Sequence, residues 1–185
     1  MKLRIPLTLM SMLVSAGLVS AQPSVPEMEE TSRAIAQALE FRIGLSAAVV
    51  AGAEKPADAI ERLRAAEAPR GAPGKDRQAE FAFAAVDVGH RLLSAGKPAE
   101  AEVFFSEAEK DFAQAIERVK NDDAYRAMLL QAVAYIRVTY LGKAKEAKED
   151  LDAARKLRPN DQALAARAEF LGNDKAEVFR PGAGK

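Results

Sequence analysis

Histidine and cysteine, the side chains that most often bind transition metals or form nucleophile–base pairs, are almost absent from this 185-residue chain. His90 is the single histidine, and the sequence contains no cysteine. A zinc or copper site needs several such ligands, and a Ser–His or Cys–His nucleophile needs a base that a third group orients. The sequence therefore predicts no metal, no other cofactor and no nucleophilic catalysis. We interpret His90 as a half-exposed histidine on a helix.

Carboxylates are plentiful, and two of them together can perform general acid–base chemistry. Such a pair needs one carboxyl group in an apolar cleft, where its pKa rises. In this chain the carboxylates alternate with lysines and arginines, opposite the apolar stripes of helical patterns. We interpret them as a solvated outer face. The residues concerned are Glu100, Glu102, Glu107, Glu109, Asp111, Glu146, Glu149, Asp150 and Asp152.

The segment 71–75, Gly-Ala-Pro-Gly-Lys, is the nearest match to a phosphate-binding loop. It lacks the Gly-x4-Gly-Lys-Ser/Thr spacing and has no strand before it, so we interpret it as a connection between helices. Lys plus Arg and Asp plus Glu both total 27. This balance gives no electrostatic reason to expect a nucleic acid partner. From these features we expect a protein that is not an enzyme.

The first 21 residues have the layout of a secretory signal peptide. A basic start at Lys2 and Arg4 precedes fifteen uncharged residues, 5–19, and small residues lead to Ala21. The alternative is an uncleaved anchor, but fifteen residues are too few to span a hydrocarbon core of about 30 Å. We predict cleavage after Ala21, no membrane insertion afterwards, and a periplasmic or secreted protein. Residues 22–31, rich in Pro and Glu, are predicted to form a flexible lead-in.

The remaining chain shows helical spacing of apolar residues, interrupted by Pro and Gly at the positions where helices start and stop. The segment 135–140 alone is rich enough in aromatic and β-branched residues to suggest a strand, but the helical pattern around it favours a helix. We predict an all-α fold with a disordered tail at 172–185. The expected helices are 31 or 32 to about 51, 56 to about 66, 78–95, 98 to about 120, 124–141, 144–157 and 162–171.

A nearly identical hexapeptide occurs three times, each time between two predicted helices. The three copies are Glu54-Lys55-Pro56-Ala57-Asp58-Ala59, Gly96-Lys97-Pro98-Ala99-Glu100-Ala101 and Gly142-Lys143-Ala144-Lys145-Glu146-Ala147. Repetition at intervals of tens of residues is typical of solenoids, in which each unit buries its apolar face only against its neighbours. The sequence therefore predicts stacked helix pairs.

These pairs resemble the tetratricopeptide repeat (TPR), a helix–turn–helix unit with a pattern spread over both helices. The small positions of that pattern hold Gly89 and Ala101 in the second pair, and a large one holds Phe105. The same pattern runs over the other two pairs. Its positions hold Ala47, Ala59, Leu63 and Ala66 in the first pair, and Ala134, Tyr135, Ala147, Leu151 and Ala154 in the third pair.

The resemblance implies a right-handed solenoid of about three irregular TPR-like repeats over residues 32–171, closed by a C-terminal capping helix. The family's unit has about 34 residues. Here Ala59, Ala101 and Ala147 are 42 and 46 residues apart, so adjacent pairs are expected to stack at uneven angles.

The resemblance also implies a concave wall formed by the first helix of each pair. Some family members grip a C-terminal carboxylate there, but Val86, Asp87, His90 and Ser94 occupy the corresponding positions, so we expect no such grip. An apolar wall instead fits an amphipathic helix or a hydrophobic peptide. The alternative is that residues 22–46 or a second copy of the chain cover it. The predicted groove residues are Phe83, Val86, His90, Leu93, Leu129, Ile136 and Tyr140.

Together these features predict a non-catalytic protein-binding scaffold or assembly adaptor in the cell envelope. Its expected partner is a protein or peptide, and homo-oligomers are left open. The alternative is an accessory domain that binds cell-wall glycan or a small ligand. Glycan sites usually present stacked exposed aromatic rings, whereas this chain has no Trp and three Tyr.

Overall fold

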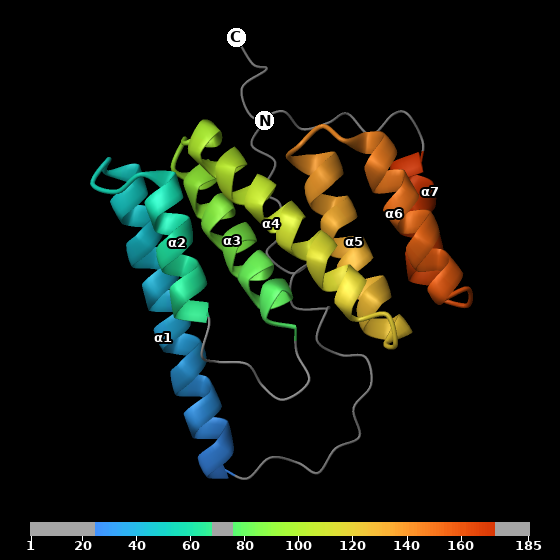
Figure 1. Cartoon of the computed structure of the whole chain (residues 1–185), viewed down its shortest axis with the longest axis horizontal. Helices are drawn as coiled ribbons and strands as arrows, with labels where there is room; N and C mark the ends of the chain where they lie inside the picture. The colour runs from blue at the N-terminus through green and yellow to red at the C-terminus, as the bar shows by residue number, and fades with distance from the viewer. Residues whose placement is uncertain (1–24, 68–75, 173–185) are drawn as a thin grey trace, which may run out of the picture. The chain divides into compact units, whose positions relative to one another are not determined.

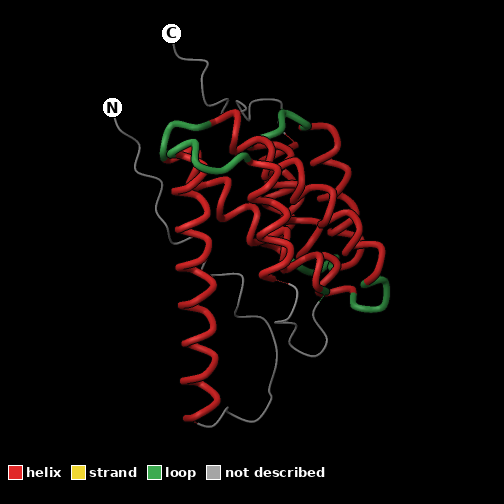
Figure 2. The backbone as a smooth tube through the Cα atoms, turned by 60° about the vertical axis from the view of Figure 1, so that its left-hand side comes forward, coloured by secondary structure: helices red, strands yellow, loops and turns green. Residues whose placement is uncertain are grey.

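The computed structural model describes residues 25–67 and 76–172, and every regular element in these ranges is a helix (Figure 2). The all-α prediction is therefore confirmed for this part of the chain. The predicted signal peptide and most of the predicted tail lie outside the described residues. The helices are α1 (Val25–Val50), α2 (Pro56–Glu67), α3 (Arg77–Ser94), α4 (Pro98–Arg118), α5 (Asp123–Thr139), α6 (Ala144–Leu157) and α7 (Gln162–Gly172).

Helix boundaries agree with the sequence prediction to within about two residues, except at the start of α1. This helix begins at Val25, so residues 25–31 of the expected lead-in are helical. Proline is tolerated in the first turn of a helix, which accommodates Pro26. The segment that resembled a strand continues α5 as far as Thr139.

The chain divides into two compact units between Gln37 and Ala38. Of the first unit, only the N-terminal half of α1 is described. Within the second unit, α2 to α7 each pack against the next helix along the chain (Figure 1). The helices pack in pairs, most extensively α3 with α4 and α5 with α6, and α4 joins these two pairs by contacting α5.

Alanine is the commonest residue of the core between these helices, and phenylalanines of α4 are its largest buried side chains. Phe104, Phe105 and Phe112 of α4 are fully buried, as are Ala101 and Ala108 on the same helix. The closest approach at a described glycine is at Gly89 of α3. A Cβ atom built there would lie 2.7 Å from Cε1 of Phe105. The absence of a side chain at Gly89 therefore lets α3 and α4 approach closely.

The three hexapeptides have the same local structure. In each, the lysine carbonyl accepts a hydrogen bond of 3.0 Å from the backbone N–H of the alanine four residues later, and that alanine is buried. A glycine with a positive φ angle ends the preceding helix in each case. Gly96 (+75°) and Gly142 (+67°) directly precede the lysine, whereas Gly52 (+71°) stands three residues before Lys55. Glycine adopts this left-handed conformation without the steric penalty of a Cβ atom, which explains its use to end a helix.

None of the described helices is both long enough and apolar enough to span a membrane.

Candidate functional site

The predicted groove residues divide into two groups by their burial. Val86, Leu129 and Ile136 are core residues. The latter two are buried because α5 packs between α4 and α6, so the stripe that carries them faces neighbouring helices rather than solvent. Phe83, His90, Leu93 and Tyr140 are half-buried and keep part of their surface accessible. A partner could therefore contact this second group only.

His90 and Tyr140 come together in an aromatic cluster at the junction of α3, α4 and α5. The Tyr140 ring stacks on Phe105, with centroids 4.1 Å apart and planes at 7°. The His90 ring is tilted against both, with its centroid 5.6 Å from that of Phe105 and 5.2 Å from that of Tyr140. Tyr135 extends the cluster towards solvent, because its ring meets Tyr140 edge-on at 5.8 Å.

Burial controls the ionisation of this cluster. It lowers the pKa of His90, and the carboxylate of Asp87 opposes this shift only in part. The pKa of Tyr140 is strongly raised by burial and by its hydrogen bond with Tyr135, whose hydroxyl oxygen lies 3.2 Å away. Both His90 and Tyr140 are therefore neutral at pH 7.

The other two accessible groove residues lie elsewhere along α3. Phe83 packs edge-on against Phe112, with ring centroids 4.8 Å apart. It precedes His90 by seven residues, about two helical turns. Leu93 follows His90 by three residues and packs against the core, while Asp87 pairs with Arg91 at 3.4 Å.

Tyr135 is not among the predicted groove residues, although this residue is 48% exposed. From the sequence, Tyr135 is predicted only as a position of the TPR-like pattern. A large aromatic residue beside the neutral cluster is nevertheless a signal that the sequence contains. We name the accessible set Phe83, His90, Leu93, Tyr135 and Tyr140 the α3–α5 surface.

Asp111 corrects the interpretation of the carboxylates as a solvated face, because it is only 1% exposed. Arg64 of α2 donates to both of its oxygens, from Nη1 at 2.9 Å and Nη2 at 2.7 Å. The same guanidinium reaches Glu107 at 3.0 Å and lies over the Phe81 ring, 4.0 Å from its centroid. The spacing already contained this signal, because Asp111 falls three residues after Ala108 and four before Ala115, within the apolar stripe of α4.

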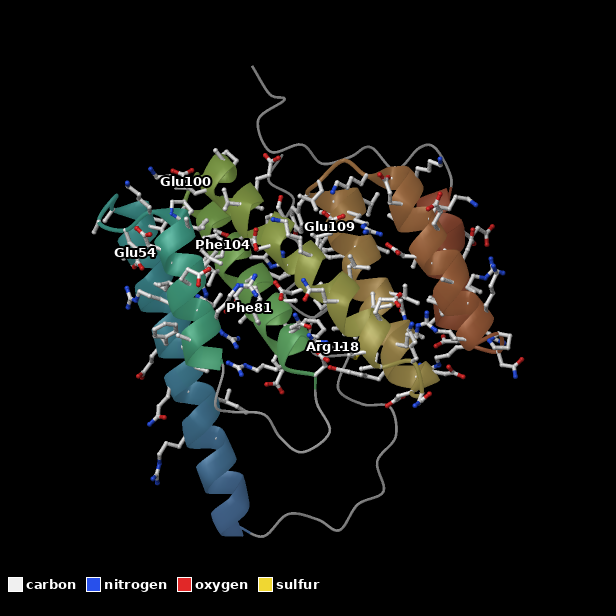
Figure 3. The ribbon with its side chains drawn as sticks, viewed as in Figure 1. Glu54, Phe81, Glu100, Phe104, Glu109 and Arg118 are labelled. Atoms are coloured by element: carbon white, nitrogen blue, oxygen red, sulfur yellow. The ribbon has the colours of Figure 1, made fainter. Side chains whose placement is uncertain are left out.

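A second network of ion pairs connects the other side of α4 with α5 and α6. Arg137 of α5 donates to Glu109 at 2.8 Å and to Asp150 of α6 at 2.7 Å, and Lys143 donates to Glu109 at 2.6 Å. Burial opposes ionisation of Glu109, but the two cations outweigh it and lower its pKa. For Asp150 burial prevails, and its pKa is raised. Figure 3 labels Phe81 and Glu109, which mark the two networks on either side of α4.

These carboxylates therefore connect helices, and each is engaged by a cation. Within residues 25–67 and 76–172, no group of three or more His, Asp or Glu side chains is placed to hold a metal ion. No family model, curated protein or solved structure matches the chain.

Proposed function

We propose that this protein is an exported, non-catalytic scaffold that binds an apolar peptide or amphipathic helix of a partner protein on its α3–α5 surface. The observation that carries the proposal is the position of Tyr135. The residue is 48% exposed, and its ring meets the half-buried ring of Tyr140, which in turn contacts His90. Aromatic residues with one accessible face contribute a large share of the energy in protein–protein interfaces.

The equivalence of the three hexapeptides supports a TPR-like arrangement, in which α1–α2, α3–α4 and α5–α6 are repeated hairpins and α7 closes the array. Ala59, Ala101 and Ala147 are buried to the same degree and make the same hydrogen bond. A solenoid of this kind presents one continuous face from the first helix of each hairpin. The α3–α5 surface belongs to that face.

Export rests on the signal-like sequence of residues 1–21. In the proposed location, the periplasm or the extracellular space, the absence of cysteine leaves the core and the ion-pair networks as the sources of stability. The intact mass of protein purified from the producing cell should correspond to a chain that begins at Gln22. A mass that retains residues 1–21 would contradict cleavage.

Charge introduced on the α3–α5 surface tests the function. Leu93→Asp and Tyr135→Asp should prevent capture of the partner from envelope extracts, because an unpaired carboxylate would be desolvated in an apolar interface. The matched control is Val103→Asp on α4, since Val103 is 40% exposed but does not belong to this surface. All three variants should keep the helical circular dichroism of the wild type. If folded Leu93→Asp and Tyr135→Asp retain every captured protein, the proposal is wrong.

A further inference from the structure

His90 stands at the point where the α3–α4 pair meets α5. It belongs to α3, whereas the two rings that it contacts are Phe105 of α4 and Tyr140, the residue that caps the C-terminus of α5. The stacking of Phe105 on Tyr140 is a direct contact between these helix pairs. A change in the His90 ring therefore acts on the junction and not on one helix alone.

The surroundings of His90 suit only its neutral form. Its Nε2 atom is buried and has no hydrogen-bond partner among the described residues. The cluster's two tyrosine hydroxyls are bonded to each other. On α3 the nearby acid is Asp87, which is shared with Arg91. From α4 the neighbouring group is the uncharged Phe105 ring, and the acidic Glu109 is held by Arg137 and Lys143.

We propose that His90 is a proton-sensitive switch at the junction of α3, α4 and α5. Protonation places a cation against the stacked Phe105 and Tyr140 rings, with a buried N–H that has no acceptor among the described residues. Such a charge is stable only when it reaches water, so the protonated ring must leave its place. Its departure removes one support of the Tyr140–Phe105 stack and loosens α5 from the α3–α4 pair. This device belongs to the fold itself and does not depend on a partner.

The direction of the pH effect follows from linkage. Burial lowers the pKa of His90 below its ordinary value of about 6.5. In the closed state the His90 ring is packed at the junction and has the lowered pKa; in the open state the ring has left and has the ordinary pKa. At a pH between these two pKa values, the open state binds the proton and the closed state does not. The closed junction is therefore fully stable above pH 6.5 and loses stability as the pH falls from 6.5 through the lowered pKa.

The single histidine makes the test direct. In the full chain, one imidazole resonance in a ¹H–¹⁵N spectrum reports the titration of His90, which should occur below pH 6.5. Amide exchange, corrected for intrinsic rates, should rise with falling pH at Tyr140, whose N–H bonds to the Ile136 carbonyl. The rise should reach about tenfold for each unit between the closed and open pKa values. The amide of Arg158, bonded to Ala154 beyond the junction, should not follow it.

Two variants separate this switch from other acid effects. His90→Phe keeps an aromatic ring without a titrating group, and His90→Gln keeps a polar group that stays neutral. In whichever variant folds, the rise in Tyr140 exchange between pH 7 and pH 5 should disappear. The proposal is overturned if His90 titrates at pH 6.5 or above, or if both the wild type and the variants show the same rise.

Discussion

At the scale of single residues, Gly89 is a position where one missing atom matters. A Cβ there would lie 2.7 and 2.8 Å from two carbons of the Phe105 ring. That ring cannot simply withdraw, because it is buried and stacks on Tyr140 at 4.1 Å. A methyl group at Gly89 must therefore displace a ring that also joins α4 to the end of α5.

Gly89→Ala should destabilise the protein. Overpacking costs about 1–3 kcal/mol, and the better helix propensity of alanine returns up to about 1 kcal/mol. We expect a net loss of about 1–2 kcal/mol in the free energy of unfolding, measured by urea denaturation. The control is Gly44→Ala in α1, where a new Cβ meets nothing within 4 Å. That variant should gain about 0.5–1 kcal/mol. Equal shifts in the two variants would show that Gly89 is not close-packed.

At the residue scale, the sequence predicts burial correctly at positions that repeat in all three hexapeptides. It predicts burial wrongly at Asp111, a position that does not repeat. The hexapeptide alanines could be assigned to helix crossings because three copies supported the assignment, and all three are buried. Asp111 was assigned to solvent on the basis of its charge. Its place in the apolar stripe of α4 indicates burial, but its partner Arg64 is 47 residues away, and no local pattern reveals that pairing.

At the scale of elements, α2 is attached to α4 through the ion pairs of Arg64 with Asp111 and Glu107, in addition to its apolar face. Arg64 is 34% exposed, whereas the carboxylate of Asp111 is 1% exposed. The consequence of removing one partner therefore depends on which partner is removed. Without Arg64, a buried carboxylate has lost its cation. Without the charge of Asp111, the guanidinium still reaches both Glu107 and water.

Arg64→Met should accordingly cost more stability than Asp111→Asn, although both remove the same ion pair. Loss of one partner from a buried pair costs about 3–5 kcal/mol, and we expect a loss near this range for Arg64→Met. Asp111→Asn should cost about 1–2 kcal/mol, because the partly exposed guanidinium keeps other partners. Chemical denaturation of both variants measures the difference. A larger loss for Asp111→Asn would contradict the arrangement of α2 on α4.

The boundaries of elements were largely readable from the sequence, because helix ends depend on local chemistry. The left-handed glycines at positions 52, 96 and 142 and the prolines that begin α2 and α4 mark them. The start of α1 was missed because Pro and Glu in residues 22–31 were taken as signs of a flexible segment. The same residue types are also favourable in a first helical turn.

At the scale of the whole molecule, the sequence predicted helix pairs but not which face of each helix remains accessible. Leu129 and Ile136 were assigned to a groove by analogy with the repeat, yet they are buried. Whether an apolar stripe faces solvent or another helix depends on packing between pairs, which the local pattern of one helix does not contain. Tyr135 illustrates the converse, since it is absent from the predicted groove and is exposed.

Site-specific photo-crosslinking in the producing cell tests the central claim most directly. A photoreactive phenylalanine analogue is incorporated at Tyr135 or, as the control, at Val103, which is similarly exposed on α4. A scaffold that binds through its α3–α5 surface should give a discrete crosslinked product with another protein from position 135 and none from position 103. The product should disappear when Leu93→Asp is combined with the probe at 135. Crosslinking from position 103 alone, or from neither position, would contradict a partner on this surface.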